Sequence, residues 1–195
     1  VVIDATHGPV YIEDHVHIKA HTRLQGPVFV GHHSHILGGT LRQVSIGPYC
    51  KINGEVANSI FMPYTNKAHA GFIGHSYVGS WSNLGALTTT SNLKNTYGVI
   101  RVTRGETRID TGQQFLGTMM GDHCKTGIGT MLTTGSTVGV GSVLYDTGLH
   151  APWIPAFTWG RPGHYEPHRL EPFLEMVTRM MARRNMTLHE EEKEL

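Results

Sequence analysis

The residues of this sequence that could do chemistry gather in one stretch, NKAHAGFIGHSYVGSWSNLGALTTTSNLKN at residues 66–95. The imidazole of His69 has an ordinary pKa of about 6.5, so it could take a proton from an attacking group near neutral pH. Glycines and small hydroxyl residues follow at short intervals, and backbone N–H groups at such turns can stabilise an oxyanion. The chain has 14 histidines, however, and an ordinary surface histidine at a turn is the alternative for His69.

A six-residue spacing of aliphatic side chains predicts the scaffold that carries this stretch. Each aliphatic residue has a small or β-branched residue two positions earlier, as Ile12 has Val10 and Ile36 has Ser34. Such a period fits a strand of about four residues with a two-residue corner, and three such units close a triangular coil. We therefore expect a left-handed parallel β-helix, with a β-sandwich as the alternative. The aliphatic residues expected inside are Ile12, Ile18, Leu24, Val30, Ile36, Ile46, Ile52, Val78, Leu84, Leu132, Val138 and Leu144.

Two segments depart from the period. The alternating residues at 99–115, around the polar tip RGET, predict a hairpin or loop that projects from the coil. Apolar residues at helical spacing within 166–186 predict one amphipathic C-terminal helix. We expect a β-helix over 1–150, an irregular linker and the helix over 151–195, with the linker covering the open end of the coil and residues 187–195 solvated.

The charge and composition of the chain limit the kinds of partner that it could bind. The formal net charge is +1 and no long run of lysine and arginine occurs, which argues against nucleic acid and membrane surfaces. Cys50 and Cys124 match no metal or disulfide spacing and predict a reducing compartment, the cytoplasm. Small molecules and copies of the chain itself are the expected partners, because flat-sided prisms can pack around a three-fold axis with ligand grooves between them.

Four stretches carry a resemblance to a known family: GEVANSIFMPYTNKAHAGFIGHSYVGSWSNLGALTTTSNLKNTYG, GDHCKTGIGTMLTTGSTVG, PAFTWG and MARRN. The sequence resembles the acetyltransferase part of the bifunctional enzymes that make UDP-N-acetylglucosamine. It is still more similar to a family of sugar nucleotidyltransferases with the same hexapeptide-repeat domain at the C-terminus. The resemblance implies a homotrimer that transfers acetyl from acetyl-CoA to the amine of a sugar phosphate like glucosamine 1-phosphate, with no metal. It also implies a missing N-terminal nucleotidyltransferase domain before Val1.

The resemblance also implies the roles of individual residues. His69 would take the proton from the attacking amine, Asn83 would bind the sugar or orient the base, and Asn92 would position His69 or the acceptor. The expected substrate contacts are Asn66, Lys67, Phe72 and Lys94, with the two lysines at the sugar phosphate. The expected acetyl-CoA contacts are Gly85, Ala86 and Gly127.

Two residues depart from the family pattern. Phe72 stands where the family has a tyrosine, and Leu87 stands where it has a second glycine. These departures favour an alternative in which the chain is a non-catalytic trimerising or regulatory module of a nucleotidyltransferase.

A third class is a zinc-dependent protein like the γ-type carbonic anhydrases, in which histidines of neighbouring subunits share a metal. The candidate histidines are His15, His17, His21, His32, His33, His35, His69 and His75. Arg183 and Arg184, on the predicted helix, fit a solvated basic face better than a contact with a CoA phosphate.

Overall fold

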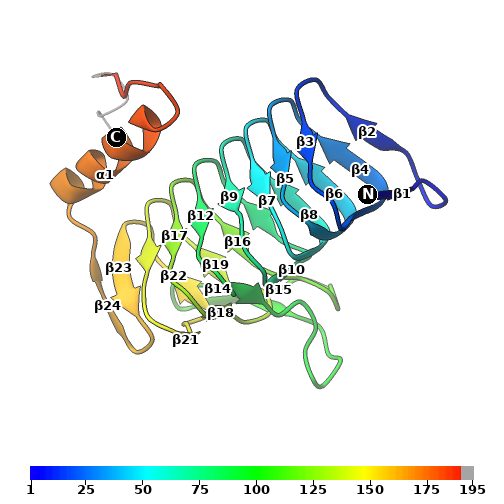
Figure 1. The fold of residues 1–195 in the computed structure, drawn as a ribbon. Helices are drawn as coiled ribbons and strands as arrows, with labels where there is room; N and C mark the ends of the chain where they lie inside the picture. The colour runs from blue at the N-terminus through cyan, green and yellow to red at the C-terminus, as the bar shows by residue number, and fades with distance from the viewer. Residues whose placement is uncertain (190–195) are drawn as a thin grey trace.

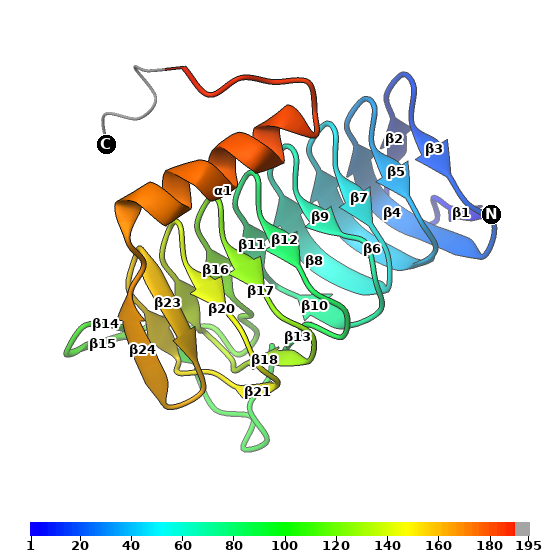
Figure 2. The same ribbon diagram turned by 60° about the vertical axis from the view of Figure 1, so that its left-hand side comes forward.

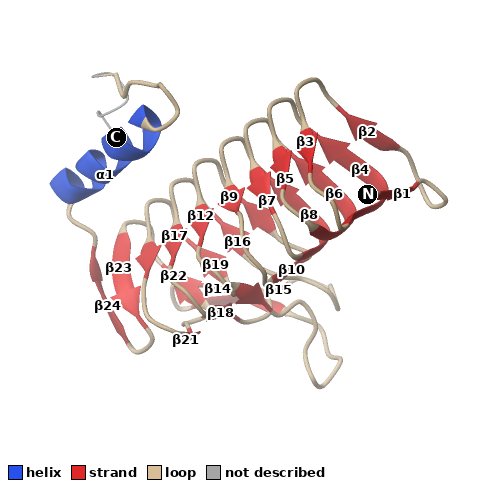
Figure 3. Cartoon of the chain, in the orientation of Figure 1, coloured by secondary structure: helices blue, strands red, loops and turns tan. Residues whose placement is uncertain are grey.

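The computed structural model describes residues 1–189 and contains a left-handed β-helix with one C-terminal helix (Figure 1). The chain winds through short parallel strands whose neighbours belong to successive coils, as the six-residue period predicts (Figure 3). A hairpin leaves the solenoid between two coils. The expected fold class is confirmed.

The strands of the coil form three sheets. The first sheet contains β1 (Val2–Asp4), β2 (Val10–Ile12), β4 (Thr22–Val30), β6 (Gly39–Ile46), β8 (Glu55–Phe61), β10 (Phe72–Gly74), β11 (Tyr77–Val78), β16 (Met119–Met120), β19 (Thr137–Val138) and β22 (Trp153–Ile154). The second contains β3 (His17–Ile18), β5 (His35–Ile36), β7 (Lys51–Ile52), β9 (Asn66–Lys67), β12 (Asn83–Leu84), β17 (Lys125–Thr126), β20 (Val143–Leu144), β23 (Thr158–Arg161) and β24 (His164–Pro167). The third contains β13 (Thr89–Thr90), β18 (Thr130–Leu132) and β21 (Gly148–Leu149). The first sheet covers parts of two faces, because β8 pairs with β10 near its start and with β11 near its end.

The core is the interior of the coil. The aliphatic residues of the period point inward and are buried, except that Ile12 and Ile18 are half-buried because they lie in the open N-terminal coils. The small residues two positions earlier are also buried, apart from the half-buried Val10 and Val16, and the hydroxyl groups of most serines and threonines among them hydrogen-bond to the backbone of the corners. Ser34 Oγ, for example, donates to the carbonyl of Gly47 and accepts the N–H of Cys50, both at 2.9 Å. These hydrogen bonds satisfy backbone groups that the corners leave outside the ladders.

One corner of the prism carries a stack of rings. At this corner, non-glycine residues adopt positive φ angles, which L residues rarely do. Their rings pack from coil to coil, and the Tyr64 and Trp81 centroids lie 4.1 Å apart. The stack consists of His15, His33, Tyr49, Tyr64, Trp81 and His123.

The C-terminal region is more regular than expected. The segment expected to be an irregular linker forms β22 and β23, which extend two of the sheets past residue 150, and β24, which pairs antiparallel with β23. Because β24 uses residues up to Pro167, the helix α1 (Leu170–Ala182) is shorter than the predicted 166–186. The antiparallel strand β24 pairs with the last strand of the second sheet, which gives this sheet edge a partner.

The helix lies along the edge of the prism that carries the ring stack (Figure 2). Phe173, Val177 and Met181 form its buried face, and Phe173 meets both His123 and Phe157 edge-on. The helix packs against the coil as predicted. The predicted solvated tail, 187–195, lies partly outside the described residues. Within residues 1–189 we find no helix with the length and apolar character to cross a membrane.

Candidate functional site

His69 lies at the corner of the coil between β9 and β10, and its side chain is exposed. The next coil stacks directly on this corner, because the N–H of Leu87 donates to the carbonyl of Ala70 at 2.9 Å. The imidazole of His69 therefore lies at an exposed corner, where a substrate could reach it.

The backbone predicted to meet acetyl-CoA continues along the same corner. The N–H of Gly129 donates to the carbonyl of Ala86 at 2.8 Å, so a third coil follows the second. A Cβ atom on Gly85 would lie 2.6 Å from the backbone of Gly127, so glycine is needed for this close approach. Gly85, Ala86 and Gly127 therefore line up beyond His69 along the solenoid axis. Leu87 occupies the turn with φ 63° and is exposed.

Lys67 does not point toward a substrate. Its side chain is 1% exposed and occupies the inward position of β9, in register with Ile52 of β7. Its Nζ donates to the carbonyl of His69 at 2.6 Å. Burial lowers the pKa of this ammonium group to about 8. The predicted contact of Lys67 with a sugar phosphate is therefore incompatible with the structure, and the residue instead holds the backbone of His69 from inside.

Asn66 and Asn83 are direct partners across β9 and β12 on the outer side of the same face. Asn83 is exposed, and Asn66 accepts a hydrogen bond from Arg184 at 3.0 Å. Asn66 is three residues before His69, so the structure groups two of the predicted polar residues on the face that leads to the imidazole.

Asn92 lies at a different corner. It follows β13, and its Nδ2 lies 2.8 Å from Nδ1 of His75, at the far end of β10 from His69. The prediction that Asn92 positions His69 is therefore not supported by its contacts, since its partner is His75. The ring of His75 stacks on Phe115 at 5.2 Å, and Phe72 packs over Gly74 beside Asn92.

The hydrogen bond from Asn92 determines which ring nitrogen of a neutral His75 carries the proton. With the Asn92 amide donating to Nδ1, the proton of a neutral imidazole is on Nε2. Burial, and then the positive charge of Arg42, lower the pKa of His75. The lowered pKa favours the neutral imidazole, with its proton on Nε2.

Lys94 stands at the start of the excursion that contains the hairpin of β14 (Arg101–Arg104) and β15 (Thr107–Asp110). Its Nζ donates to the carbonyl of Val99 at 2.6 Å. Its side chain is half-buried, and this hydrogen bond ties the two ends of the loop 94–99 together.

The early histidines pair with one another by ring contacts. His15 stacks on His33 with centroids 4.8 Å apart, and His17 meets His35 at 5.0 Å across β3 and β5. Glu13 accepts hydrogen bonds from the backbone and ring of His32. Within residues 1–189 no group of three or more His, Cys, Asp or Glu side chains is arranged to hold a metal ion.

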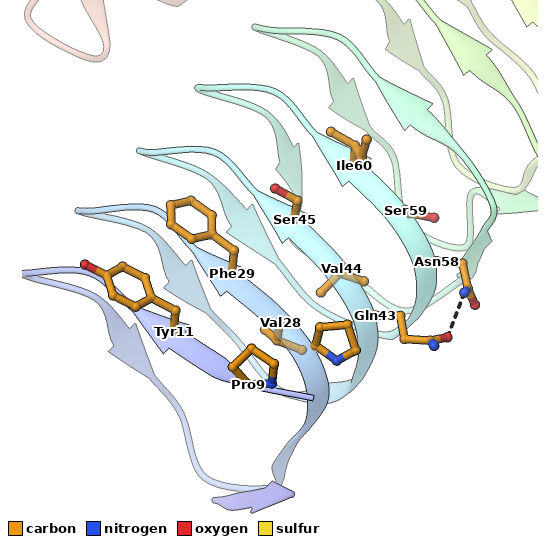
Figure 4. A pocket seen from close by; sticks show the side chains of 11 residues that line it. Pro9, Tyr11, Val28, Phe29, Gln43, Val44, Ser45, Asn58, Ser59 and Ile60 are labelled. Carbon is orange, nitrogen blue, oxygen red and sulfur yellow. Dashed lines mark hydrogen bonds between the residues drawn. The ribbon is translucent and has the colours of Figure 1, made fainter. Parts of the chain in front are cut away.

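An apolar hollow of about 410 Å³ lies on another face, over strands β2, β4, β6 and β8 (Figure 4). The rings of Tyr11 and Phe29 stack at 5.7 Å along it, and Ile60 is 48% exposed. Gln43 and Asn58 form a hydrogen bond at its rim. The hollow has few groups that could fix a polar substrate, so it fits a contact surface better than a catalytic site.

Three residues of this region have other roles than the sequence predicts: Lys67 points inward instead of toward a sugar phosphate, His75 pairs with Asn92 instead of standing in a metal site, and Arg184 binds Asn66 instead of lying on a solvated face. For Lys67 a signal existed, because Phe61, Lys67 and Ile73 are six residues apart. For His75 the signal was the coil length, because Asn92, its hydrogen-bond partner, is 17 residues later. Arg184 is 118 residues from Asn66, and no local pattern connects them.

Comparison with known proteins supports a relationship in sequence. No protein-family model matches the chain. The chain is 33% identical over 90 residues to the bifunctional protein GlmU of Methanococcus vannielii, which is 46% of this chain and 22% of that relative. It is 30% identical over 91 residues to the bifunctional sugar-1-phosphate nucleotidylyltransferase/acetyltransferase of Sulfurisphaera tokodaii, which is 47% of this chain and 23% of the relative. The chain resembles the hexapeptide-repeat acyltransferases. The matched segments span less than a quarter of these relatives.

Solved structures agree on the fold. The product of the BC4754 gene of Bacillus cereus aligns with a TM-score of 0.55 at 14% identity, covering 93% of this chain and 91% of that one. The N-acyltransferase AntD of Bacillus cereus, in complex with dTDP and 3-hydroxybutyryl-CoA, aligns with a TM-score of 0.52 at 11% identity, covering 89% and 91%. At these identities the likeness establishes the shared β-helix alone.

The buried Lys67 predicts a pH dependence of stability. Its pKa is about 8 in the folded chain and 10.5 when exposed, so the unfolded chain binds more protons between these values. The wild type should therefore gain stability as pH rises from about 8 to about 10.5, by about 3 kcal/mol from this lysine. Lys67→Met lacks this gain, and Lys125, whose pKa is also lowered, is present in both proteins.

Urea unfolding at several pH values within this window measures the effect. As pH rises, the free energy of unfolding of the wild type should increase relative to that of Lys67→Met. Lys19→Met, which removes an exposed lysine, is the matched control. A difference that stays constant over the window would contradict the buried placement of a charged Lys67.

The pKa of His75 should lie below that of an exposed histidine, and Arg42→Gln should raise it, because a nearby positive charge disfavours the imidazolium form. Histidine C–H resonances in an NMR titration report this pKa. Arg161→Gln removes a charge from the C-terminal coils and serves as the control. An unchanged His75 pKa in Arg42→Gln would exclude the electrostatic contact.

Proposed function

We propose that this chain transfers acetyl from acetyl-CoA to the amine of a sugar phosphate of the glucosamine 1-phosphate kind, with His69 as the general base. The observation that carries the proposal is the exposed imidazole at a corner of the prism. The same corner carries Gly85 and Ala86 in the next coil and Gly127 in the coil after it. The similarity in sequence to bifunctional proteins with acetyltransferase activity supports it.

The chemistry requires a base, an oxyanion site and a slot for the carrier. The sugar amine would attack the thioester carbonyl of acetyl-CoA while His69 takes a proton from the amine nitrogen. The backbone N–H of Ala86 would stabilise the negative oxygen of the tetrahedral intermediate, since the N–H groups of Gly85 and Leu87 on either side donate to the carbonyls of Thr126 and Ala70. Its collapse breaks the carbon–sulfur bond and forms the amide, and the imidazolium returns the proton to the leaving thiolate of CoA.

The contacts inside the coil support the role of His69. A base must be held at a fixed position relative to the reacting atoms, because small displacements cost much of the rate. Lys67 binds the carbonyl of His69 from the interior, and the N–H of Leu87 holds the neighbouring Ala70. The backbone at His69 is therefore fixed from two directions while its side chain faces outward.

The proposal extends to compartment and wider context. Cys50 and Cys124 are free and buried, and burial raises their thiol pKa values to about 12 and about 11. Unpaired, inert thiols fit a protein of the cytoplasm, where acetyl-CoA is used. A sugar-phosphate nucleotidyltransferase part joined to this chain, as in the bifunctional relatives, would use the acetylated product.

A second function, trimerisation, is favoured by the apolar hollow of Figure 4. Exposed apolar side chains on a flat face are typical of subunit contacts, and Tyr11 and Ile60 are 61% and 48% exposed. We propose that this face joins three copies and that the catalytic grooves lie between neighbouring copies.

Replacing the proposed base should abolish most of the activity. With acetyl-CoA and glucosamine 1-phosphate, His69→Ala should release thiol about 100-fold more slowly than the wild type, because general base catalysis is lost. Binding of acetyl-CoA, measured by calorimetry, should persist. His7→Ala removes an exposed histidine of the N-terminal loop and should keep the wild-type rate. Equal rates in His69→Ala and the wild type would reject the proposal.

Sedimentation equilibrium tests the trimer. The wild type should have three times the chain mass of 21.5 kDa at micromolar concentration. Ile60→Arg places a charge in the apolar hollow and should shift the protein toward monomers. Ala5→Arg, on an exposed loop, should leave the mass unchanged. A monomeric wild type would refute the trimer.

A further inference from the structure

Positive charges gather where the end of α1 meets the second face of the coil. Lys51 of β7 and the two arginines that follow α1, Arg183 and Arg184, line a hollow of about 190 Å³. Tyr64 and Trp81, from the ring stack, form one of its walls. Figure 2 shows the helix running along the coils toward this region. Residues from three coils and from α1 with its C-terminal end therefore meet at one small basic hollow.

Arg184 is fixed in place by the fold. Its guanidinium group donates to Oδ1 of Asn66 at 3.0 Å, and Asn66 is the register partner of Lys51 across β7 and β9. One guanidinium hydrogen bond is thus used to orient the group, and its other N–H donors remain available to a ligand. Arg184 is half-buried, so its charge is already partly desolvated on folding, before a ligand binds.

Within the described part of the chain, no carboxylate forms an ion pair with the charges of the hollow, which are those of Lys51, Arg183 and Arg184. The pKa of Lys51 is lowered by burial and then by Arg184 and Arg183. The pKa of the neighbouring His35 is lowered by burial and then by His17, Lys51, Arg184 and Lys19. These cations repel one another, and an anion in the hollow would relieve the repulsion.

We propose that this hollow binds the phosphoryl group of a small-molecule anion. Arginine forks and a lysine point charge are the groups that recognise phosphate oxygens. The volume of about 190 Å³ is smaller than the 300–1,000 Å³ of pockets that enclose whole ligands, so the hollow suits one anionic group with the rest of the ligand outside. Asn66 lines the hollow and is three residues before His69, so the hollow could hold the phosphate that the buried Lys67 cannot reach.

The site is separable from acetyl transfer. It uses Lys51, Arg183 and Arg184, none of which takes part in the proton transfer at His69. Phosphate could come from the sugar phosphate, from CoA or from inorganic phosphate, and these sources share the chemistry that the hollow recognises. His69→Ala should therefore bind phosphate as the wild type does, and a failure of catalysis would leave the binding proposal intact.

Isothermal titration calorimetry with inorganic phosphate at pH 7 tests the site on the full chain. The wild type should bind saturably, and Arg184→Gln should weaken binding about tenfold or more, because a charge-assisted hydrogen bond is lost. Lys51→Gln should weaken it in the same direction. Arg179→Gln, on the same helix and paired with Glu175, should bind as the wild type does. Thermal unfolding of each variant establishes that it is folded.

The source of the phosphate follows from further titrations. Glucosamine 1-phosphate, CoA and dephospho-CoA are compared with inorganic phosphate, and the ligand whose affinity Arg184→Gln reduces most is the natural class. Binding of any of them that depends on Arg184 and weakens with added salt supports the proposal. No saturable binding of any of these anions to the wild type, or equal binding by a folded Arg184→Gln, would overturn it.

Discussion

The stacking of identical three-sided coils is the constraint on which the rest of the structure depends. Each coil leaves room inside for one aliphatic side chain per face and, at the corners, only for small residues or glycine. The coils are so close that a Cβ atom on Gly54 would lie 3.0 Å from Nζ of Lys67. A charged side chain in this interior has to find its partners within the corner itself. Lys67 does so by binding the carbonyl of His69, which makes the core residue part of the site.

Much of the fold could be predicted from the sequence, because the constraint is periodic and leaves a periodic trace. The inward series through Leu24, Ile36 and Leu144 is buried as predicted, and so are the small residues beside it. Two features escaped. Lys67 has the right spacing but the wrong residue type for a core, so the sequence predicts a contact with the sugar phosphate instead. The segment from Trp153 to Pro167 is rich in proline and glycine, yet ladder pairing with β19 and β20 orders it into strands.

The candidate site was predicted only in part, because a motif fixes positions along the chain but not the corner at which each one lies. His69 and the backbone of Ala86 share a corner, since 17 residues, about one coil, separate them. The same count leads from Asn92 to His75 and places the amide at another corner. The excursion after Asn92 interrupts the period and hides this relation. Contacts between distant segments, such as Arg184 with Asn66, depend on how the helix packs and have no trace in local sequence.

Strand β9 connects these observations. Its two residues alternate across the wall of the coil, so Asn66 faces the basic hollow outside and Lys67 faces the interior. Arg184 holds the strand from the outside, and Lys67 holds the turn that follows it from the inside. The exposed side chain of His69 extends from that turn. A phosphate in the hollow would therefore lie on the outer side of the strand whose following turn carries the imidazole, so the proposed binding site and the proposed base share β9 while using different side chains.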